Sequence, residues 1–159
     1  FATAYELQKD NFEITRTMDE QIVQEQGMSI PDIFAQKGEE TFRNLETELV
    51  KRISHMDNIV VSCGGGTVMR QCNVGEMKKN GTIVLLTATP QTVYERVKGS
   101  HNRPLLEKNM NPQYIEQLME ARRPKYEAAA DIIVKTDGRT AKEICQEIKE
   151  RLEINDNTK

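Results

Sequence analysis

The stretch VVSCGGGTV, residues 60–68, places three consecutive glycines directly after a run of apolar, β-branched residues. The apolar run predicts a buried strand, and one glycine is enough to turn the chain at its end. Three glycines therefore suggest that something other than their own side chains must lie against this backbone. The alternative is a tight turn that joins the strand to a helix.

The glycines belong to a regular alternation of strand and helix patterns. Residues 58–63, 82–87 and 131–136 have the length and composition of strands, and the first two are apolar enough to be buried on both faces, as parallel strands are. Apolar residues at helical spacing occupy residues 39–54 and 141–152. This alternation predicts an α/β fold with a mostly parallel sheet flanked by helices on both faces.

Several residues mark where local structure begins, ends or changes. Ser29, followed by Pro31, predicts the start of a short helix, and Gly38 separates it from the next helix. Pro124 lies inside a helical pattern and predicts a kink or a restart there. Residues 98–112, KGSHNRPLLEKNMNP, have the polar composition of a mobile flap, and a plain surface loop is the alternative.

Length, composition and charge exclude several classes of protein. A chain of 159 residues with 37% apolar and 30% charged residues predicts one domain, residues 1–159, with a real core. A membrane-spanning helix needs about 18 to 20 apolar residues, and no apolar run here is near that length, so we expect no membrane association. The net charge of −3, without a dense Lys/Arg stripe, argues against nucleic acid as a partner. Cys63, Cys72 and Cys145 have no CxxC spacing, which favours free thiols in the cytoplasm.

The order of the sequence motifs resembles the shikimate kinase family. MDEQIVQEQGMSIPDIFAQKGEETFRNLE is followed by VVSCGGGTV, NRPLL, ARRPKYEAAAD and TDGRTAKEI, at the spacings that the family shows, over residues 18–144. The resemblance implies a P-loop kinase fold with a mobile lid at about residues 98–112. It also implies transfer of the γ-phosphate of ATP to the 3-hydroxyl of shikimate, with Mg²⁺, in the pathway to the aromatic amino acids. We expect the protein to be a monomer.

By this resemblance two arginines hold the carboxylate of shikimate, namely Arg43 and Arg122. A planar guanidinium suits this task because it offers two parallel donors, which a lysine cannot. The residues themselves leave alternatives open. Arg43 could instead form an i,i+3 pair with Glu46 on a solvated helix face, and Arg123 could be the functional arginine in place of Arg122.

The resemblance also assigns the glycines and one carboxylate to the substrate. With no Cβ in the way, the backbone N–H groups of Gly64, Gly65 and Gly66 can approach a carboxylate or a hydroxyl. Asp19 matches the family carboxylate that orients the hydroxyl to be phosphorylated and accepts its proton. The alternative makes Asp19 an ordinary acid in the first turn of a helix.

The sequence departs from the family at the metal site. The family usually has Asp-x-Asp, in which the first Asp supports Mg²⁺ through water, and here that position is Thr17. Ser62 matches a hydroxyl that the family places near the metal. The departure leaves the effect of Thr17 on metal binding open.

Three further arginines match nucleotide positions of the family. Arg103, in NRPLL, matches the lid arginine that moves over the phosphates, where a cation would balance the charge that develops during transfer. Arg96 and Arg139 match positions that line the adenine site. For both of these a purely solvated role is the alternative.

The phosphate-binding motif GxxxxGK[ST] does not occur in these 159 residues. Aligned on Asp19, Phe1 falls where that motif ends. Loss of a central strand would cost many times the ~5 to 15 kcal/mol of stability that a domain has, so we expect an N-terminal strand and P-loop before Phe1. Intact mass compared with 18.2 kDa would test this expectation. The open alternatives are a non-catalytic shikimate-binding module without an ATP site and a related gluconate-type kinase.

Overall fold

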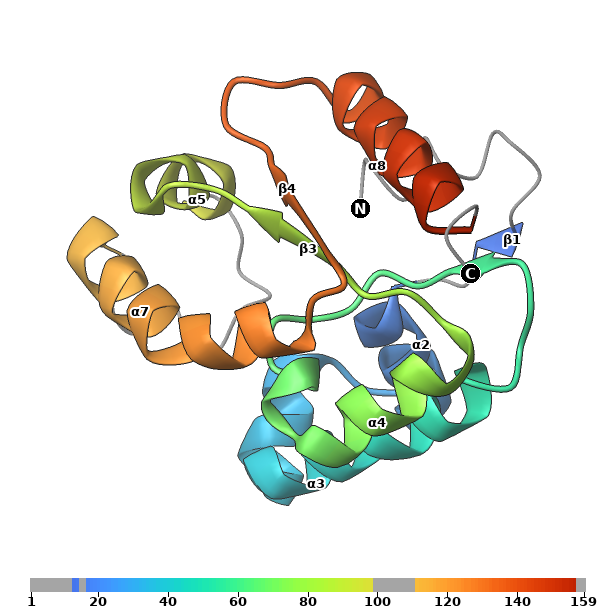
Figure 1. Ribbon diagram of the computed structural model, residues 1–159. Coiled ribbons are helices and arrows are strands. Elements are labelled where there is room, and N and C mark those ends of the chain that lie inside the picture. Colours follow the sequence, from blue (N-terminus) through green and yellow to red (C-terminus); the bar gives the residue numbers. More distant parts are fainter. Residues whose placement is uncertain (1–12, 15–16, 99–110, 157–159) are drawn as a thin grey trace.

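The computed structural model describes residues 13–14, 17–98 and 111–156, and Figure 1 shows how their helices and strands are arranged. In chain order the elements are β1 (Glu13–Ile14), α2 (Met18–Gln26), α3 (Ile30–Ile53), β2 (Ile59–Val60), the 3-10 helix η1 (Thr67–Met69), α4 (Gln71–Asn80), β3 (Val84–Thr87), α5 (Pro90–Val97), α7 (Pro112–Ala129), β4 (Ile132–Lys135) and α8 (Ala141–Asp156). Among the described helices, none has the length and apolar character of a membrane span.

The strands form two parallel pairs. β1 lies beside β2, with Ile14 opposite Val60, and β3 lies beside β4, with Leu86 opposite Val134. Figure 1 shows α8 on one side of β3 and β4, α5 and α7 on the other, and α2, α3 and α4 grouped together. Parallel strands joined through helices confirm the predicted α/β class, and β1 is a strand that the sequence pattern did not reveal.

The apolar core consists of three clusters. The largest joins α2 to α3, the second packs α8 against β4, and the third packs α5 against α7. Val134 is fully buried beneath α8, but its neighbour Leu86 keeps 42% of its surface exposed. The prediction that residues 58–63 and 82–87 are buried on both faces is wrong, because no residue of either run is fully buried and Leu86 is exposed. An apolar run does not say how far the elements that cover it reach.

The local signals have mixed outcomes. The backbone N–H of Asp32 donates to the Ser29 side chain at the start of α3, and Gly38 interrupts the helical backbone with a φ of 83°, so both predictions are confirmed. α7 continues through Pro124 as one helix, so of the predicted kink or restart the restart does not occur. The predicted lid, apart from residues 98, 111 and 112, lies outside the described residues.

Candidate active site

The three glycines link β2 to η1 and pass the amino end of α2, where the backbone N–H of Met18 donates to the carbonyl oxygen of Ser62 at 3.1 Å. Among the described glycines, those with a left-handed backbone are Gly27, Gly38 and Gly138. None of Gly64, Gly65 and Gly66 needs the freedom of φ that glycine gives. The alternative of a turn that requires glycine is therefore weakened, and close approach by other groups is the better explanation.

Side chains from α3 and α7 fill the space that side chains on Gly66 and Gly65 would need, and a side chain from α2 lies at ordinary contact distance from a Cβ on Gly64. A Cβ atom on Gly66 would be 2.1 Å from Nη1 of Arg43, on α3. A Cβ atom on Gly65 would be 2.9 Å from the hydroxyl of Tyr126, on α7. At Gly64 the nearest atom is Oδ1 of Asp19, on α2, at 3.4 Å. The glycine loop, residues 64–66, is thus the place where α2, α3 and α7 converge.

Arg43 is held by two carboxylates of its own helix. Nη1 donates to Oε2 of Glu46 at 2.6 Å, while Nη2 and Nε donate to Oε1 of Glu39 at 3.0 and 3.3 Å. The i,i+3 pair that the sequence left open is present, but its face is not solvated, because the Glu46 side chain is only 1% exposed and that of Arg43 14%. Burial opposes the charge of Arg43, but the hydrogen bonds and charges of Glu46 and Glu39 outweigh it, so its pKa lies above its ordinary value.

Arg43 keeps donors for a ligand while it is held in this way. A guanidinium has five N–H groups, and the bonds to Glu46 and Glu39 use three of them. These bonds leave two N–H groups, which is the number that a bidentate carboxylate requires.

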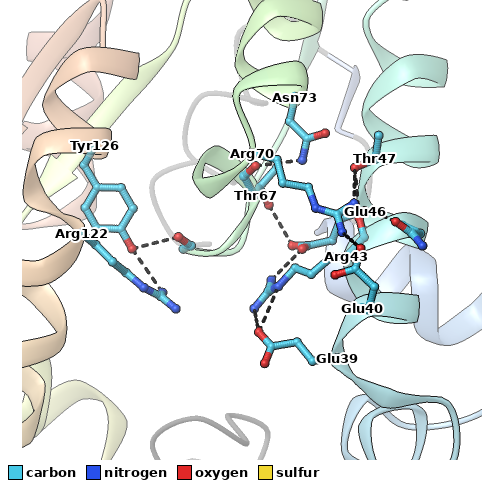
Figure 2. Close-up of polar contacts among 12 residues, drawn as sticks. Glu39, Glu40, Arg43, Glu46, Thr47, Thr67, Arg70, Asn73, Arg122 and Tyr126 are labelled. Carbon is cyan, nitrogen blue, oxygen red and sulfur yellow. Dashed lines mark hydrogen bonds and ion pairs between the residues drawn. The ribbon is translucent and has the colours of Figure 1, made fainter.

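The opposite wall of the site is formed by α7. The hydroxyl of Tyr126 donates to the carbonyl oxygen of Gly65 at 2.9 Å and accepts from Nη1 of Arg122 at 3.5 Å. Figure 2 shows Arg43 and Arg122 reaching from α3 and α7 toward the same space beside the glycine loop. Arg123 instead pairs with Glu120 on the exposed side of α7. The structure therefore brings Arg122, rather than Arg123, to the glycine loop.

Thr17 has a structural task at the start of α2. The backbone N–H of Glu20 donates to Oγ1 of Thr17 at 3.1 Å, and the N–H of Thr17 donates to Oε2 of Glu20 at 3.1 Å. This reciprocal arrangement is a capping box, which the spacing in TMDE could have revealed. Asp19 lies in the first turn of the same helix and also beside the glycine loop, so one residue can be both a helix acid and part of the candidate site.

Two of the predicted nucleotide arginines bind the carboxyl end of β4. Arg96 donates to the hydroxyl and the carbonyl oxygen of Thr136 at 2.9 and 3.0 Å. Arg139 donates to the carbonyl oxygen of Lys135 at 2.9 Å and to Glu147 at 2.5 Å. Neither is purely solvated, and in the described part of the chain neither hydrogen-bonds to the glycine loop. Arg103 lies outside the described residues.

Comparison with known protein families shows to which family this chain belongs. The model of the shikimate kinase family matches residues 13–153. The chain belongs to the shikimate kinase family. This membership confirms the resemblance carried by the sequence motifs, and it does not favour the gluconate-type or the non-catalytic alternative.

Individual members of the family are similar over most of the chain. A shikimate kinase from Persephonella marina is 42% identical over 135 residues, which cover 85% of this chain and 80% of the relative. One from Thermodesulfovibrio yellowstonii is 38% identical over 131 residues, covering 82% and 75%. The structure of an Acinetobacter baumannii shikimate kinase in complex with shikimate has a TM-score of 0.91 at 27% identity, covering 96% of this chain and 86% of that chain. A shikimate kinase from Aquifex aeolicus has a TM-score of 0.81 at 36% identity, covering 97% and 89%.

The residues at the amino end of α2 fit a Mg²⁺ site that needs only few protein ligands. Mg²⁺ is usually held by one or two carboxylates together with phosphate oxygens and water. Asp19 could supply one carboxylate, and the backbone carbonyl of Ser62 accepts from the N–H of Met18, the residue before Asp19. In the described residues no group of three or more His, Cys, Asp or Glu side chains could hold a metal by itself. The phosphates would therefore have to complete the coordination.

Sequence reasoning missed three residues of this family member's site. Tyr126 follows Arg122 by four residues, a spacing that places both on one face of a helix and could have revealed it. Thr67 and Asn73 are fully buried polar residues beside the glycine loop. No sequence signal marks them, because a polar residue in a helical pattern is usually on the surface.

Proposed function

We infer that this protein is an ATP-dependent kinase that transfers the γ-phosphate of ATP to the 3-hydroxyl of shikimate. One observation supports the substrate most directly. Arg43 and Arg122 approach the same space from opposite sides of the glycine loop, in a chain that belongs to the shikimate kinase family. Two guanidinium groups that face one space suit a small molecule with a carboxylate.

Each residue around that space is proposed to have a distinct task. Arg43 and Arg122 hold the substrate carboxylate, while the side-chain-free glycine loop lets the backbone lie against the ring. Asp19, whose carboxylate lies beside the glycine loop, orients the hydroxyl and accepts its proton as the phosphoryl group arrives. Because phosphoryl transfer depends mainly on positioning and charge, these fixed contacts are the chief contribution of this part of the chain.

The nucleotide side of the reaction is proposed from the family motifs. Arg103 would balance charge on the transferred group, and Arg96 and Arg139 would lie beside the adenine. Mg²⁺, held with help from Asp19 and Ser62, would neutralise phosphate charge when ATP is bound. We further propose that residues 1–159 form one domain, that the protein acts as a monomer in the cytoplasm, and that its cysteines are free thiols, as they are in the structure.

Steady-state kinetics of the full chain test this proposal. We expect release of ADP that depends on shikimate and on Mg²⁺, with no comparable release when gluconate replaces shikimate. Asp19→Asn should lower kcat by about 10²- to 10⁴-fold, the usual contribution of a positioned base, while shikimate still binds. Calorimetric binding of shikimate without any ADP release by the unaltered protein would instead favour the non-catalytic binding module.

A further inference from the structure

A chain of buried polar side chains connects α4 to the substrate arginine. Nδ2 of Asn73 donates to the carbonyl oxygen of Thr67 at 2.8 Å, and Oγ1 of Thr67 donates to Oε1 of Glu46 at 3.0 Å. The other oxygen of Glu46 accepts from Arg43 at 2.6 Å. Figure 2 shows these residues in sequence, from Asn73 on α4 to Arg43 on α3.

The two links from Asn73 through Thr67 to Glu46 are shielded from water. Thr67 is 0% exposed, and Asn73 and Glu46 are each 1% exposed. Burial of a carboxylate is costly unless both of its oxygens have partners. Among the described residues no buried side-chain nitrogen or oxygen lacks a hydrogen-bond partner. Thr67 and Arg43 each satisfy one oxygen of Glu46, so together they fix the plane of its carboxylate.

This connection sets the position of both parts of the carboxylate site. Thr67 directly follows Gly66, the glycine against which the Arg43 guanidinium lies. A displacement of Thr67 would therefore move the glycine loop and, through Glu46, the guanidinium as well. Asn73 limits such displacement because it binds the Thr67 backbone from another helix.

We propose that Thr67 and Asn73 are positioning residues for the substrate carboxylate. They hold Arg43 and Gly66 in the arrangement that binds it, without themselves touching the substrate. The inference rests on the proposed function, since shikimate is the ligand whose binding it concerns. The physical reason is that affinity for the substrate carboxylate depends on where the Arg43 guanidinium is placed and not only on its charge.

The first experiment compares Thr67→Val, which keeps the shape but removes the hydroxyl, with Thr67→Ser, which keeps the hydroxyl. In the full chain, Thr67→Val should raise the KM for shikimate about three- to tenfold, the loss expected for one hydrogen bond. The KM for ATP should change less than about twofold. In Thr67→Ser the shikimate KM should stay near that of the unaltered protein. Thr47→Val is the matched control, because its hydroxyl donates to the backbone carbonyl of Arg43 and not to Glu46.

Two further measurements keep the proposal open to refutation. If Thr67→Val does not fold, Asn73→Ala should still raise the shikimate KM selectively. ¹⁵N NMR of the Arg43 guanidinium, which needs no activity, should show slower N–H exchange in the unaltered protein than in Thr67→Val. Equal changes in both KM values would overturn the positioning role. A lower melting temperature with an unchanged shikimate KM and unchanged exchange would overturn it as well.

Absence of shikimate-dependent ADP release by the unaltered protein would refute the proposed function. The NMR comparison would still show whether Thr67 holds the Arg43 guanidinium in place through Glu46.

Discussion

The guanidinium of Arg43 occupies the space that a side chain on Gly66 would need. A Cβ atom there would be 2.1 Å from Nη1 and 2.6 Å from Cζ of Arg43. The φ of Gly66 is −85°, which any residue adopts, so the backbone does not require glycine. Glycine at this position is instead explained by the ion pair of Arg43 with Glu46, which holds the guanidinium against the loop.

Gly66→Ala should therefore impair substrate binding more than folding. The added methyl group would push the Arg43 side chain away from Glu46, and we expect shikimate affinity to fall at least about tenfold while ATP affinity changes little. Titration calorimetry with each ligand measures both values. Gly75→Ala is the control, because nothing lies within 4 Å of its added Cβ and alanine in α4 should stabilise the protein by about 0.5 to 1 kcal/mol. Unaltered shikimate affinity in Gly66→Ala would refute this account of the glycine.

Arg43→Lys tests whether the guanidinium geometry is required. Lysine keeps a cation beside buried Glu46 but loses the parallel donors, so shikimate binding should weaken about ten- to a hundredfold with ATP affinity nearly unchanged. Calorimetry on the folded variant gives both affinities. Equal loss of the two would mean that Arg43 supports the fold rather than the ligand.

The two neighbouring arginines on α7 form a matched pair of tests. Arg122 contacts Tyr126 at the glycine loop, and Arg123 pairs with Glu120 in solvent. Arg122→Ala should raise the KM for shikimate about ten- to a hundredfold, whereas Arg123→Ala should leave it within about twofold. If Arg123→Ala has the larger effect, the assignment of the substrate arginine is wrong.

Two variants of Thr17 test separately its role as the N-cap of α2 and the effect of its position on Mg²⁺ binding. Thr17→Ala should lower the free energy of unfolding by about 1 kcal/mol, because the capping box is lost. Thr17→Asp keeps a good N-cap and restores the Asp-x-Asp pattern, so it should retain stability and lower the Mg²⁺ concentration needed for half-maximal activity. Urea denaturation and a Mg²⁺ titration measure the two effects. An unchanged Mg²⁺ requirement in Thr17→Asp would show that this position does not influence the metal.

Asp137 predicts a dependence of stability on acid pH. Hydrogen bonds from the Thr92 side chain and from the backbone and hydroxyl of Thr89 lower its pKa from an ordinary 3.8 to about 2. A carboxyl with a lowered pKa stabilises the fold above its ordinary pKa, and this stabilisation is lost as the pH falls toward 2. The melting temperature of Asp137→Asn should therefore lie below that of the unaltered protein at pH 6, and the difference should shrink between pH 4 and pH 2. A difference that stays constant over this range would contradict the assigned hydrogen bonds.

Local features of the fold could be predicted because their causes lie within a few residues. The Ser29 cap, the break at Gly38 and the pairing of Arg43 with Glu46 all join positions at most four residues apart. The motif order likewise identified the family and named the arginines. The α/β class followed from the alternation of apolar periods, which reports the local surroundings of each segment.

The sequence by itself determined the family, the α/β class and the residue types of the carboxylate site. Only the tertiary structure decided that Arg122 rather than Arg123 faces the loop, that Arg43 fills the space beside Gly66, and that Thr67 binds Glu46 across 21 positions. These contacts join helices that are distant in the chain, and no periodicity or spacing reports them. They exist because the packing of α3, α4 and α7 around the glycine loop and η1 brings each buried polar group within reach of a hydrogen-bond partner.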